Sequence, residues 1–276
     1  MKIAVIPNMK ATGVELALVP VVEALKALGA EVSSLDVDTD FLSPLTDVLI
    51  GECDVVVTLG GDGTIIHAAK RAALYGKPVL GINCGHLGFM AGLESDELTE
   101  LRALICGDYT VEQRMMLDIC VNLDDEERHF SALNEAVISR RELSRMIELE
   151  VHNQDELVMT YHADGVILAT PTGSTAYSLS AGGPIIDPAL NCMLMTPICP
   201  HSLHSRAYIF GQDAQLHVRL PEVGTVACLT IDGEEGIPIN HTHTITVRRS
   251  DAVANMIKIK PMAFYEVLNK KLMNRR

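Results

Sequence analysis

Residues 1–108 alternate between short apolar runs and longer segments whose apolar residues recur at helical spacing. The apolar runs are rich in β-branched residues and are bounded by turn residues, which predicts buried strands. These strands cover residues 2–6, 30–35, 54–59 and 78–83. Helices are predicted between or after them, at residues 14–28, 65–72 and 96–104. Such alternation is typical of a parallel, doubly wound sheet, in which ligands bind beyond the carboxyl ends of the strands.

Two residues affect where these helices begin. Pro20 falls inside the first helix, so we expect a kink or a late start there. Ser95 stands before the third helix, where its hydroxyl can cap the first turn. Asp96 and Glu97 follow it, at positions where the helix dipole favours acidic side chains.

From Met116 onward, short β-type runs replace the alternation. The runs are residues 117–123, 130–139, 147–152, 156–161, 166–169, 215–220, 226–231 and 244–248. Asn153-Gln154-Asp155 and Asp232-Gly233 are turn signals between such runs. The pattern predicts an all-β domain with one helical insertion near residues 174–181.

The C-terminal segment, residues 263–272, returns to helical spacing. Its apolar residues Phe264, Val267, Leu268 and Leu272 share one face, which needs a surface to pack on, and we expect the first domain to provide it. The predicted organisation is therefore an α/β domain of residues 1–108, joined by a C-terminal helix at 262–276, and a β-rich domain of residues 109–261.

The turn Gly60-Gly61-Asp62-Gly63 joins a predicted strand to a predicted helix. Its glycines lack the Cβ atoms that would keep a ligand from the backbone, and they permit positive φ. Backbone N–H groups and a helix N-terminus, with Thr64 in the first turn or as its cap, can then face a phosphate. Because a carboxylate would repel that phosphate, Asp62 must take a proton, hold a metal or bond a sugar hydroxyl. The motif alone is equally compatible with a tight turn that binds nothing.

A second stretch, residues 164–184, concentrates glycines and hydroxyl side chains. A strand ends at Thr170-Pro171, and a hydroxyl-rich turn opens a short helix that Gly182-Gly183-Pro184 terminates. The hydroxyls of Thr172, Ser174 and Thr175 can cap that helix or reach a ligand. Tyr177 offers a ring face and a phenol, which suit a base or a ribose. Hydroxyl capping with no ligand is the alternative interpretation.

Asn134-Glu135 lies within the otherwise mostly apolar run of residues 130–139. Neighbouring side chains on a strand point to opposite faces, so one of the two can be buried. A buried polar side chain must be satisfied by the fold or by a ligand.

The composition of the chain argues against nucleic-acid binding and against association with a membrane. A net charge of −14 argues against a nucleic-acid or anionic-membrane surface, and the absence of tryptophan argues against stacking platforms for single strands. No stretch approaches the length of a membrane span. The seven cysteines are scattered and include no Cys-x-x-Cys pair, which indicates a reducing compartment and hence the cytoplasm.

Other candidate clusters favour structural interpretations. No metal ligand set is identified: His201 with His204, and His241 with His243, lack a third ligand at useful spacing and are expected to be surface or loop residues. Lys70-Arg71 is interpreted as a solvated helix face rather than a phosphate contact. The acidic run at residues 124–128 is interpreted as a hairpin tip.

Taken together, these motifs resemble the NAD kinases. The resemblance rests on residues 60–63, 81–83, 85–89, 134–135, 170–177, 182–184 and 197–203, in the expected order. Gly-Gly-Asp-Gly also occurs in phosphofructokinases and in diacylglycerol and sphingosine kinases. A more selective indication of NAD kinases is the stretch Thr170-Pro171-Thr172-Gly173-Ser174-Thr175-Ala176-Tyr177.

The resemblance implies transfer of a phosphoryl group from ATP to the adenosine ribose 2′-hydroxyl of NAD, which makes NADP. Polyphosphate is left open as an alternative donor. It also implies a Rossmann-like first domain, a β-rich second domain, a divalent metal such as Mg²⁺, and a homo-oligomer, a dimer or a tetramer. Asp62 resembles the catalytic carboxylate, a general base for the 2′-hydroxyl. The positions that resemble the family's NAD contacts are Asp62, Gly63, Asn134, Glu135, Arg145, Asp164, Thr175, Ala176, Tyr177 and Ser180.

The chain departs from the family pattern at two places. Glu234 stands where the family often has glutamine after Asp-Gly, and His162 stands near a position that can carry lysine. Two other functions are considered. A kinase for a lipid or a sugar phosphate would need a different second phosphate loop or a membrane-facing apolar surface. A non-catalytic dinucleotide-binding regulator would keep residues 170–177 but would not need Asp62.

Overall fold

A computed structural model of the chain describes residues 1–35, 43–85, 88–123, 126–142, 145–202, 205–260 and 264–273. Several positions singled out in the sequence lie outside the described residues, namely His86, Leu87, Asp124, Asp125, Leu203, His204, residues 262, 263 and 274–276 of the predicted C-terminal helix, and the side chain of Leu272. The chain forms two compact units: unit 1 comprises Met1–Gln113 and Ala252–Arg276, and unit 2 comprises Arg114–Asp251. Within the described ranges, no helix combines the length and hydrophobicity that a membrane span requires.

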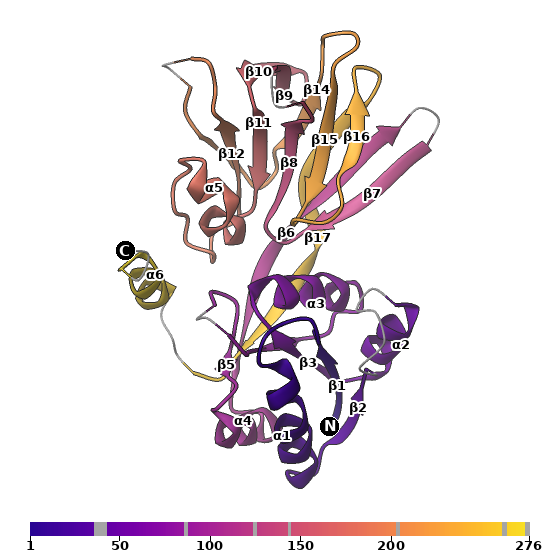
Figure 1. The fold of residues 1–276 in the computed structure, drawn as a ribbon, viewed down its shortest axis with the longest axis vertical. Coiled ribbons are helices and arrows are strands. Elements are labelled where there is room, and N and C mark those ends of the chain that lie inside the picture. Colours follow the sequence, from indigo (N-terminus) through magenta and orange to yellow (C-terminus); the bar gives the residue numbers. More distant parts are fainter. Residues whose placement is uncertain are drawn as a thin grey trace. The chain divides into compact units, whose positions relative to one another are not determined.

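Unit 1 is an α/β domain (Figure 1). Its elements are β1 (Lys2–Pro7), α1 (Val14–Ala27), β2 (Glu31–Ser34), α2 (Pro44–Glu52), β3 (Val55–Gly60), α3 (Asp62–Leu74), β4 (Val79–Asn83), β5 (Leu93–Glu94), the 3₁₀ helix η1 (Leu98–Glu100), α4 (Leu101–Cys106) and α6 (Phe264–Met273). Strands β6 (Thr110–Leu123) and β17 (Thr244–Lys258) carry the chain into unit 2 and back. The four predicted strands are confirmed.

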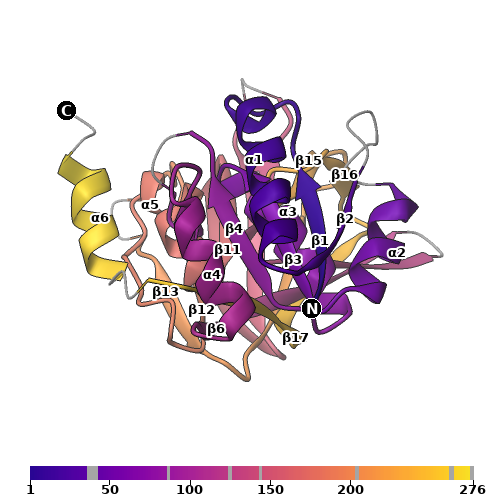
Figure 2. The ribbon, with the colours of Figure 1, turned by 90° about the horizontal axis from the view of Figure 1, so that it is seen from below.

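The sheet of unit 1 is parallel, with strand order β2-β1-β3-β4. Helices α1 and α4 cover one face, and α2 and α3 cover the other (Figures 1 and 2). The face under α1 and α4 holds a core of aliphatic side chains from the strands and these two helices. All six residues of β3 are buried, as expected of a central strand covered on both sides.

Helix α1 runs through Pro20 without a late start, so that expectation is wrong. Pro20 is exposed, and water can satisfy the carbonyl that its missing N–H leaves unpaired. Val14 and Ala17 before it, and Val21 and Leu25 after it, are buried and hold both halves of the helix on the sheet.

Ser95 does not cap a helix, which corrects a second expectation. Its backbone N–H donates to the carbonyl of Asn83 at 3.0 Å, continuing the pairing of β4 with β5. Helical structure therefore begins only with η1, at Leu98. Helix α2 was not predicted, although Ser43, whose hydroxyl accepts from Leu45 N, and Pro44 in the first turn are typical helix-start residues.

Unit 2 is built almost entirely of antiparallel strands. Its further elements are β7 (Glu126–Ala132), β8 (Glu135–Arg140), β9 (Ile147–Asn153), β10 (Glu156–Ala163), β11 (Gly165–Ala169), the 3₁₀ helix η2 (Thr172–Thr175), α5 (Tyr177–Ser180), β12 (Cys192–Ile198), β13 (Tyr208–Gly211), β14 (Gln215–Arg219), β15 (Val226–Ile231) and β16 (Ile237–Asn240). The helical insertion near residues 174–181 is confirmed.

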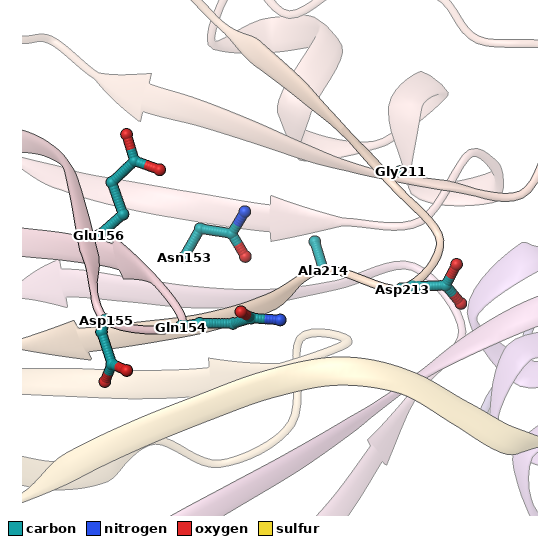
Figure 3. Close-up of a pocket in the computed structure, with 7 residues that line it drawn as sticks. All are labelled: Asn153, Gln154, Asp155, Glu156, Gly211, Asp213 and Ala214. Carbon is teal, nitrogen blue, oxygen red and sulfur yellow. The ribbon is translucent and has the colours of Figure 1, made fainter.

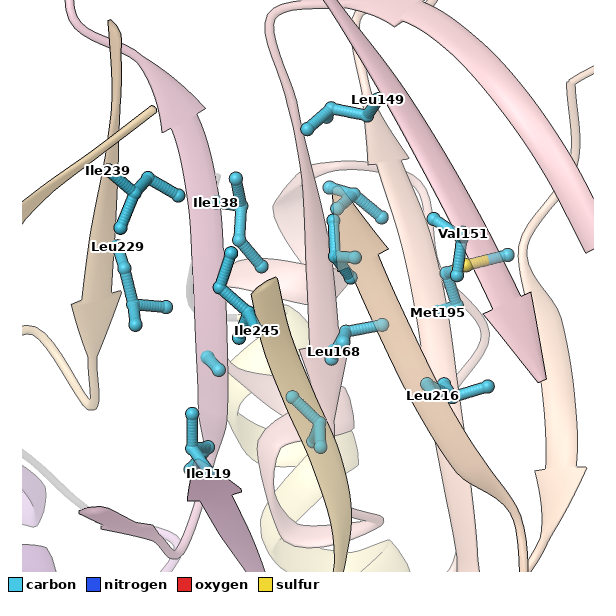
Figure 4. Packing of buried hydrophobic residues seen from close by; sticks show 14 of the residues in the cluster. Ile119, Ile138, Leu149, Val151, Leu168, Met195, Leu216, Leu229, Ile239 and Ile245 are labelled. Atoms are coloured by element: carbon cyan, nitrogen blue, oxygen red, sulfur yellow. The ribbon is translucent and has the colours of Figure 1, made fainter. Parts of the chain in front are cut away.

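Two sheets of unit 2 enclose its core. One sheet has strand order β13-β12-β11-β8-β15-β16, and the other contains β10-β9-β14-β17 with β6 and β7. Buried side chains such as Ile138 and Leu168 on the first sheet, and Val151 and Leu216 on the second, belong to one cluster (Figure 4). Buried and more exposed residues alternate along β9 and β14, whereas β11 is buried throughout and corresponds to a continuous apolar run.

The run at residues 130–139 is two strands rather than one. Strand β7 pairs with β6, whereas β8 pairs with β11 and β15, so the chain changes sheets at Leu133-Asn134. The carboxylate of Asp232 accepts the N–H groups of Leu133, Asn134 and Glu135 and so replaces strand pairing at this step. Asn134 thus lies at a break and not within a strand.

The C-terminal helix α6 belongs to unit 1, in agreement with the expectation from its apolar face. Val267 and Leu268 on this face are buried. The ring of Phe264 lies 6.3 Å, between centroids, from the ring of Phe89, which follows β4 in the chain.

Candidate functional site

Asp62 is the first residue of α3, and only Gly61 separates it from the carboxyl end of β3. The helix begins three residues earlier than its apolar pattern predicted, with Gly61 as the N-cap and Thr64 in the first turn. The N–H groups of the first turn of a helix have no acceptor within the helix, so they are available to an anion. A phosphate-type site at this turn is therefore geometrically possible.

The glycines of this turn act through absent side chains. A Cβ atom on Gly61 or Gly63 would meet nothing within 4 Å, which leaves the backbone open to a ligand. Neither residue uses the positive φ that glycine permits, so their role lies in the open space over the backbone.

The Asp62 carboxylate has three donors around it. Its Oδ1 accepts the N–H of Met90 at 3.0 Å, and its Oδ2 accepts the N–H of Phe89 at 3.0 Å. The Nζ of Lys271 on α6 lies 3.1 Å from the same Oδ2. The carboxylate is thus fixed by two backbone groups and one ammonium, and its orientation does not depend on a ligand.

Polar side chains follow the neighbouring strands. Asn8, after β1, donates to the hydroxyl of Thr64 at 2.8 Å, and Asn83, at the end of β4, donates to the Glu94 carboxylate at 2.7 Å. Burial raises the pKa of the Glu94 carboxyl, and the hydrogen bond from Asn83 opposes that effect. The charge of Asp62 is among the neighbouring negative charges that raise the pKa of Glu94 further. These carboxylate and amide oxygens are the ligand types that Mg²⁺ prefers.

In unit 2, Asp232 holds the start of β8. Its Oδ2 accepts the N–H of Leu133 at 2.8 Å, and its Oδ1 accepts the N–H groups of Asn134 and Glu135, each at 2.9 Å. Asp232 itself has φ of 47°, a conformation that an Asp-Gly turn tolerates. The turn predicted at Asp232-Gly233 therefore organises Asn134-Glu135, which lies 97 or more positions away in the sequence.

The end of β11 meets the same segment. The N–H of Thr170 donates to the carbonyl of Asn134 at 2.8 Å, and its hydroxyl donates to the carbonyl of Leu133 at 2.6 Å. A Cβ atom on Gly173 would lie 2.2 Å from the carbonyl oxygen of Asn134, so only glycine allows this approach. The structure thus brings the residues at 134–135 together with the turn at 170–177.

Glu135 is a buried carboxyl in this group. Burial raises its pKa to about 8, and the nearby charge of Asp232 adds to the effect. Its Oε2 is buried and has no hydrogen-bond partner among the described residues. At neutral pH the side chain is therefore mainly a neutral acid that can donate a hydrogen bond.

The hydroxyls of the turn separate into structural and accessible ones. The Ser174 hydroxyl is buried, donates to the carbonyls of Pro171 and Ile186, and accepts from Ile186 N. The Ser178 hydroxyl is buried and bonded to Thr196. By contrast, Tyr177 is 45% exposed and Ser180 is exposed, whereas Thr175 and Ala176 are half-buried. The Ser174 hydroxyl is thus used within the fold, but it does not cap the helix, and no side chain of the described residues caps η2 or α5.

Asp164 and Arg145 do not lie with the group formed by residues 134–135 and the turn at 170–177. Asp164 precedes β11, whereas Thr170 follows it, so the two lie at opposite ends of this strand. Both carboxylate oxygens of Asp164 are bound by the guanidinium of Arg140, at 3.0 and 3.1 Å. Arg145 is exposed and forms an ion pair with Glu222.

The weaker clusters have structural explanations in most cases. Arg71 forms an ion pair with Asp47 at 2.6 Å that ties α3 to α2, so it is not simply a solvated residue. His243 is buried and lies in the turn before β17, so it is a loop residue and not a surface residue. Cys120, Glu127 and His129 are of types that bind metals and lie close together on the β6–β7 hairpin. Glu127 and His129 are exposed and hydrogen-bond each other at 2.9 Å.

A pocket of about 460 Å³ lies between two turns of unit 2 (Figure 3). It is lined by Asn153, Gln154, Asp155, Glu156, Gly211, Asp213 and Ala214, and none of the predicted site residues is among them. Three of its side chains are carboxylates, which makes it unsuited to a phosphate-bearing ligand.

Comparison with known proteins identifies the family. The model of the ATP-NAD kinase N-terminal domain matches residues 22–109, and that of the ATP-NAD kinase C-terminal domain matches residues 133–259. The chain belongs to the NAD kinase family. The NAD kinase of Symbiobacterium thermophilum is 46% identical over 224 residues, 80% of this chain and 79% of the relative. That of Caldanaerobacter subterraneus is 42% identical over 229 residues, 82% of this chain and 81% of the relative. The enzyme therefore phosphorylates NAD.

Solved structures agree with this assignment. Yeast NADH kinase in complex with NADH has a TM-score of 0.84 and 26% identity, covering 99% of this chain and 87% of that one. An NAD kinase from Archaeoglobus fulgidus in complex with ATP has a TM-score of 0.80 and 26% identity, covering 99% of each chain. The α/β domain, the β-rich domain and the C-terminal helix expected from the sequence are those of an NAD kinase.

Three residues that orient the candidate site residues were not predicted in that role from the sequence. Asp232 was recognised only as a turn residue, and Gly88 only as part of a motif. Lys271 had no signal at all, because it meets Asp62 across 209 positions of sequence. Only the first two carry a local signal, in the Asp-Gly turn and in the glycines around Phe89.

Proposed function

We propose that ATP is the phosphoryl donor and that the adenosine ribose 2′-hydroxyl of NAD is the acceptor, with Asp62 as the general base. The observation that carries the proposal is the Asp62 carboxylate itself, which two backbone N–H groups hold beside the open N-terminus of α3. In the reaction, the hydroxyl oxygen attacks the γ-phosphorus while its proton passes to Asp62. Positioning and electrostatic stabilisation supply the remainder of the rate enhancement.

The N-terminus of α3 is proposed to bind phosphate. Gly60, Gly61, Gly63 and Thr64 surround N–H groups that have no acceptor inside the helix. The open space over Gly61 and Gly63 supports a close approach of the phosphate oxygens.

The group at the start of β8 is proposed to bind the nucleoside part of NAD. Asn134 offers an amide, Glu135 a neutral buried carboxyl that can donate, and Tyr177 an exposed ring. Thr175, Ala176 and Ser180 complete this surface. We also assign NAD contacts to Asp164 and Arg145, which the sequence resemblance supports although they lie away from this group.

A divalent cation such as Mg²⁺ fits the residues near Asp62. The negative charge of Asp62 contributes to raising the pKa of Glu94, and a cation held there would offset that repulsion. When bound, such an ion draws charge from the phosphoryl oxygens. Glu94 is the described residue that would hold it, with Asp62 nearby.

We further propose that the enzyme is cytoplasmic and homo-oligomeric. All seven cysteines are free, which is consistent with a reducing compartment. Size-exclusion chromatography with light scattering measures the subunit count, and a monomer would contradict the second proposal.

The deciding experiment follows NADP formation with an NADP-specific dehydrogenase. ATP or polyphosphate is supplied as donor with magnesium, and NAD or NADH as acceptor. Asp62→Asn is expected to lower turnover at least about 10²-fold, whereas NAD affinity by calorimetry stays unchanged. Asp108→Asn, at an exposed loop position, is the control. Full turnover by Asp62→Asn would contradict the role of Asp62, and polyphosphate used in preference to ATP would contradict the proposed donor.

A further inference from the structure

Among the described residues, Lys271 is a cation in direct contact with the proposed base. Its Nζ lies 3.1 Å from Asp62 Oδ2, and both side chains are about three-quarters buried, with exposed fractions of 25% and 29%. The same Nζ lies 4.1 Å from the centroid of the Phe89 ring. The ammonium is therefore held by a carboxylate on one side and an aromatic face on another.

Helix α6 is tied down at both of its ends by the same segment. Phe264, at its first turn, packs on the Phe89 ring, and Lys271, two turns later, lies over that ring. The N–H of Phe89 in turn donates to Asp62. The position of Lys271 next to Asp62 is thus also supported by the contact of Phe264 with Phe89 and by the buried side chains of Val267 and Leu268, and not by the ion pair alone.

The charge balance at this place favours an additional anion. The N-terminus of a helix carries partial positive charge, so an ammonium beside the first residue of α3 is unfavourable unless negative charge compensates it. The Asp62 carboxylate supplies one negative charge. The N–H groups at the start of α3 and the Lys271 ammonium together can bind more negative charge than that. The open backbone at Gly61 and Gly63 leaves room for such a ligand.

Lysine is also the appropriate residue type. An ammonium has three N–H donors, and the ion pair with Asp62 uses one of them. Its compact charge binds phosphate oxygens as a point charge, as phosphate-binding lysines do elsewhere.

We propose that Lys271 is a catalytic residue that binds the phosphoryl group during its transfer. The proposal rests on the role of Asp62 as base. As ATP arrives, the ammonium exchanges Asp62 for an oxygen of the γ-phosphoryl group, which leaves Asp62 Oδ2 able to accept a proton. The ribose oxygen then forms a bond to the γ-phosphorus, and the bond from that phosphorus to the β,γ-bridging oxygen breaks. Its electron pair stays on ADP, the hydroxyl proton goes to Asp62, and Lys271 stays protonated throughout.

A purely structural ion pair is the alternative, and the neighbouring lysine provides the comparison. Lys270 lies on the same helix, is exposed, and pairs with Glu266 one turn earlier at 3.1 Å. Lys270 carries the same charge as Lys271 and is its neighbour on α6. Its ammonium donates to Glu266, whereas that of Lys271 donates to Asp62. Lys270→Met is therefore a matched control for Lys271→Met.

The test measures kcat, KM for ATP and for NAD, NAD affinity by calorimetry, and Tm for the full-length variants. Lys271→Met is expected to lower kcat about 10²-fold, with NAD affinity unchanged and Tm close to that of Lys270→Met. Lys271→Arg keeps a positive charge at this place and is expected to recover a large part of the lost kcat. Lys270→Met is expected to behave as the unmodified enzyme.

Two results would overturn the proposal. The first is a kcat of Lys271→Met equal to that of Lys270→Met. The second is an equal loss in Lys271→Met and Lys271→Arg accompanied by a fall in Tm, because this indicates a structural ion pair only. Asp62→Asn, measured in parallel, tests the role of Asp62 separately from the role of Lys271. Full activity of Asp62→Asn would contradict the assignment of Asp62 as general base. The comparison of the lysine variants would still decide whether a positive charge at residue 271 assists phosphoryl transfer.

Discussion

A Cβ atom on Gly88 would lie 2.3 Å from Oδ1 of Asp62. Contacts this short do not occur, so the carboxylate can reach the N–H groups of Phe89 and Met90 only because residue 88 is glycine. The orientation of the proposed base therefore depends on a residue that carries no functional group.

Gly88→Ala is expected to displace the Asp62 carboxylate. A shift of about 1 Å in a catalytic group lowers rates by up to about 10²-fold, so kcat should fall by roughly that factor while NAD affinity is retained. Gly85→Ala is the control, because a Cβ atom there would meet nothing within 4 Å. Steady-state kinetics of the two variants make the comparison, and equal activities would show that Asp62 tolerates the displacement.

Asp232→Asn is expected to destabilise unit 2. The amide keeps one acceptor oxygen but places an NH₂ group against one or more of the N–H groups that now donate to the carboxylate. The free energy of unfolding is expected to fall by about 2 kcal/mol or more, since hydrogen bonds to charged groups are among the stronger ones. Thermal unfolding measures it. Asp155→Asn, at the exposed β9–β10 turn, should leave Tm unchanged, and a similar effect of both substitutions would contradict the role of Asp232.

Glu135 is expected to make stability depend on pH. Its pKa is about 8 in the folded protein and near 4.5 when unfolded, so the folded state binds more protons between these values. Its contribution to stability is therefore fully present below about pH 4.5 and is lost as the pH rises to about 8. Glu135→Gln removes this dependence. Tm of the unmodified protein and of the variant is measured from pH 5 to 9. Between pH 5 and 8, the Tm of the unmodified protein should fall relative to that of the variant. A constant difference would show that Glu135 is ionised throughout.

Ser174 and Ser180 should respond in opposite ways. Ser174→Ala removes the buried bonds to Pro171 and Ile186, so Tm should fall by an amount corresponding to about 1–3 kcal/mol with NAD affinity unchanged. Ser180→Ala alters an exposed side chain and should weaken NAD binding without changing Tm. Differential scanning fluorimetry and calorimetry test both, and weakened binding by Ser174→Ala at constant Tm would show that its hydroxyl serves the ligand instead.

Local pattern was sufficient for much of this protein. The four parallel strands, most strands of unit 2 and the C-terminal helix follow from hydrophobic periodicity, because each element buries one face or both against its neighbours. The positions of Gly60-Gly61-Asp62-Gly63 and of residues 170–177 at the ends of strands also follow, since turn residues and a change of period mark these ends. The resemblance to NAD kinases rests on the same local motifs.

Tertiary structure decided the features that depend on distant partners. Ser95 is held by the carbonyl of Asn83 and so does not cap a helix, and Asn134 lies at a break because Asp232 takes the N–H groups of three consecutive residues. The same holds for the donors around Asp62, which come from residues 89, 90 and 271. A side chain's own sequence neighbourhood specifies whether it can form a strand, a helix or a turn. Which group it finally bonds depends on elements far along the chain, and only their packing brings these together.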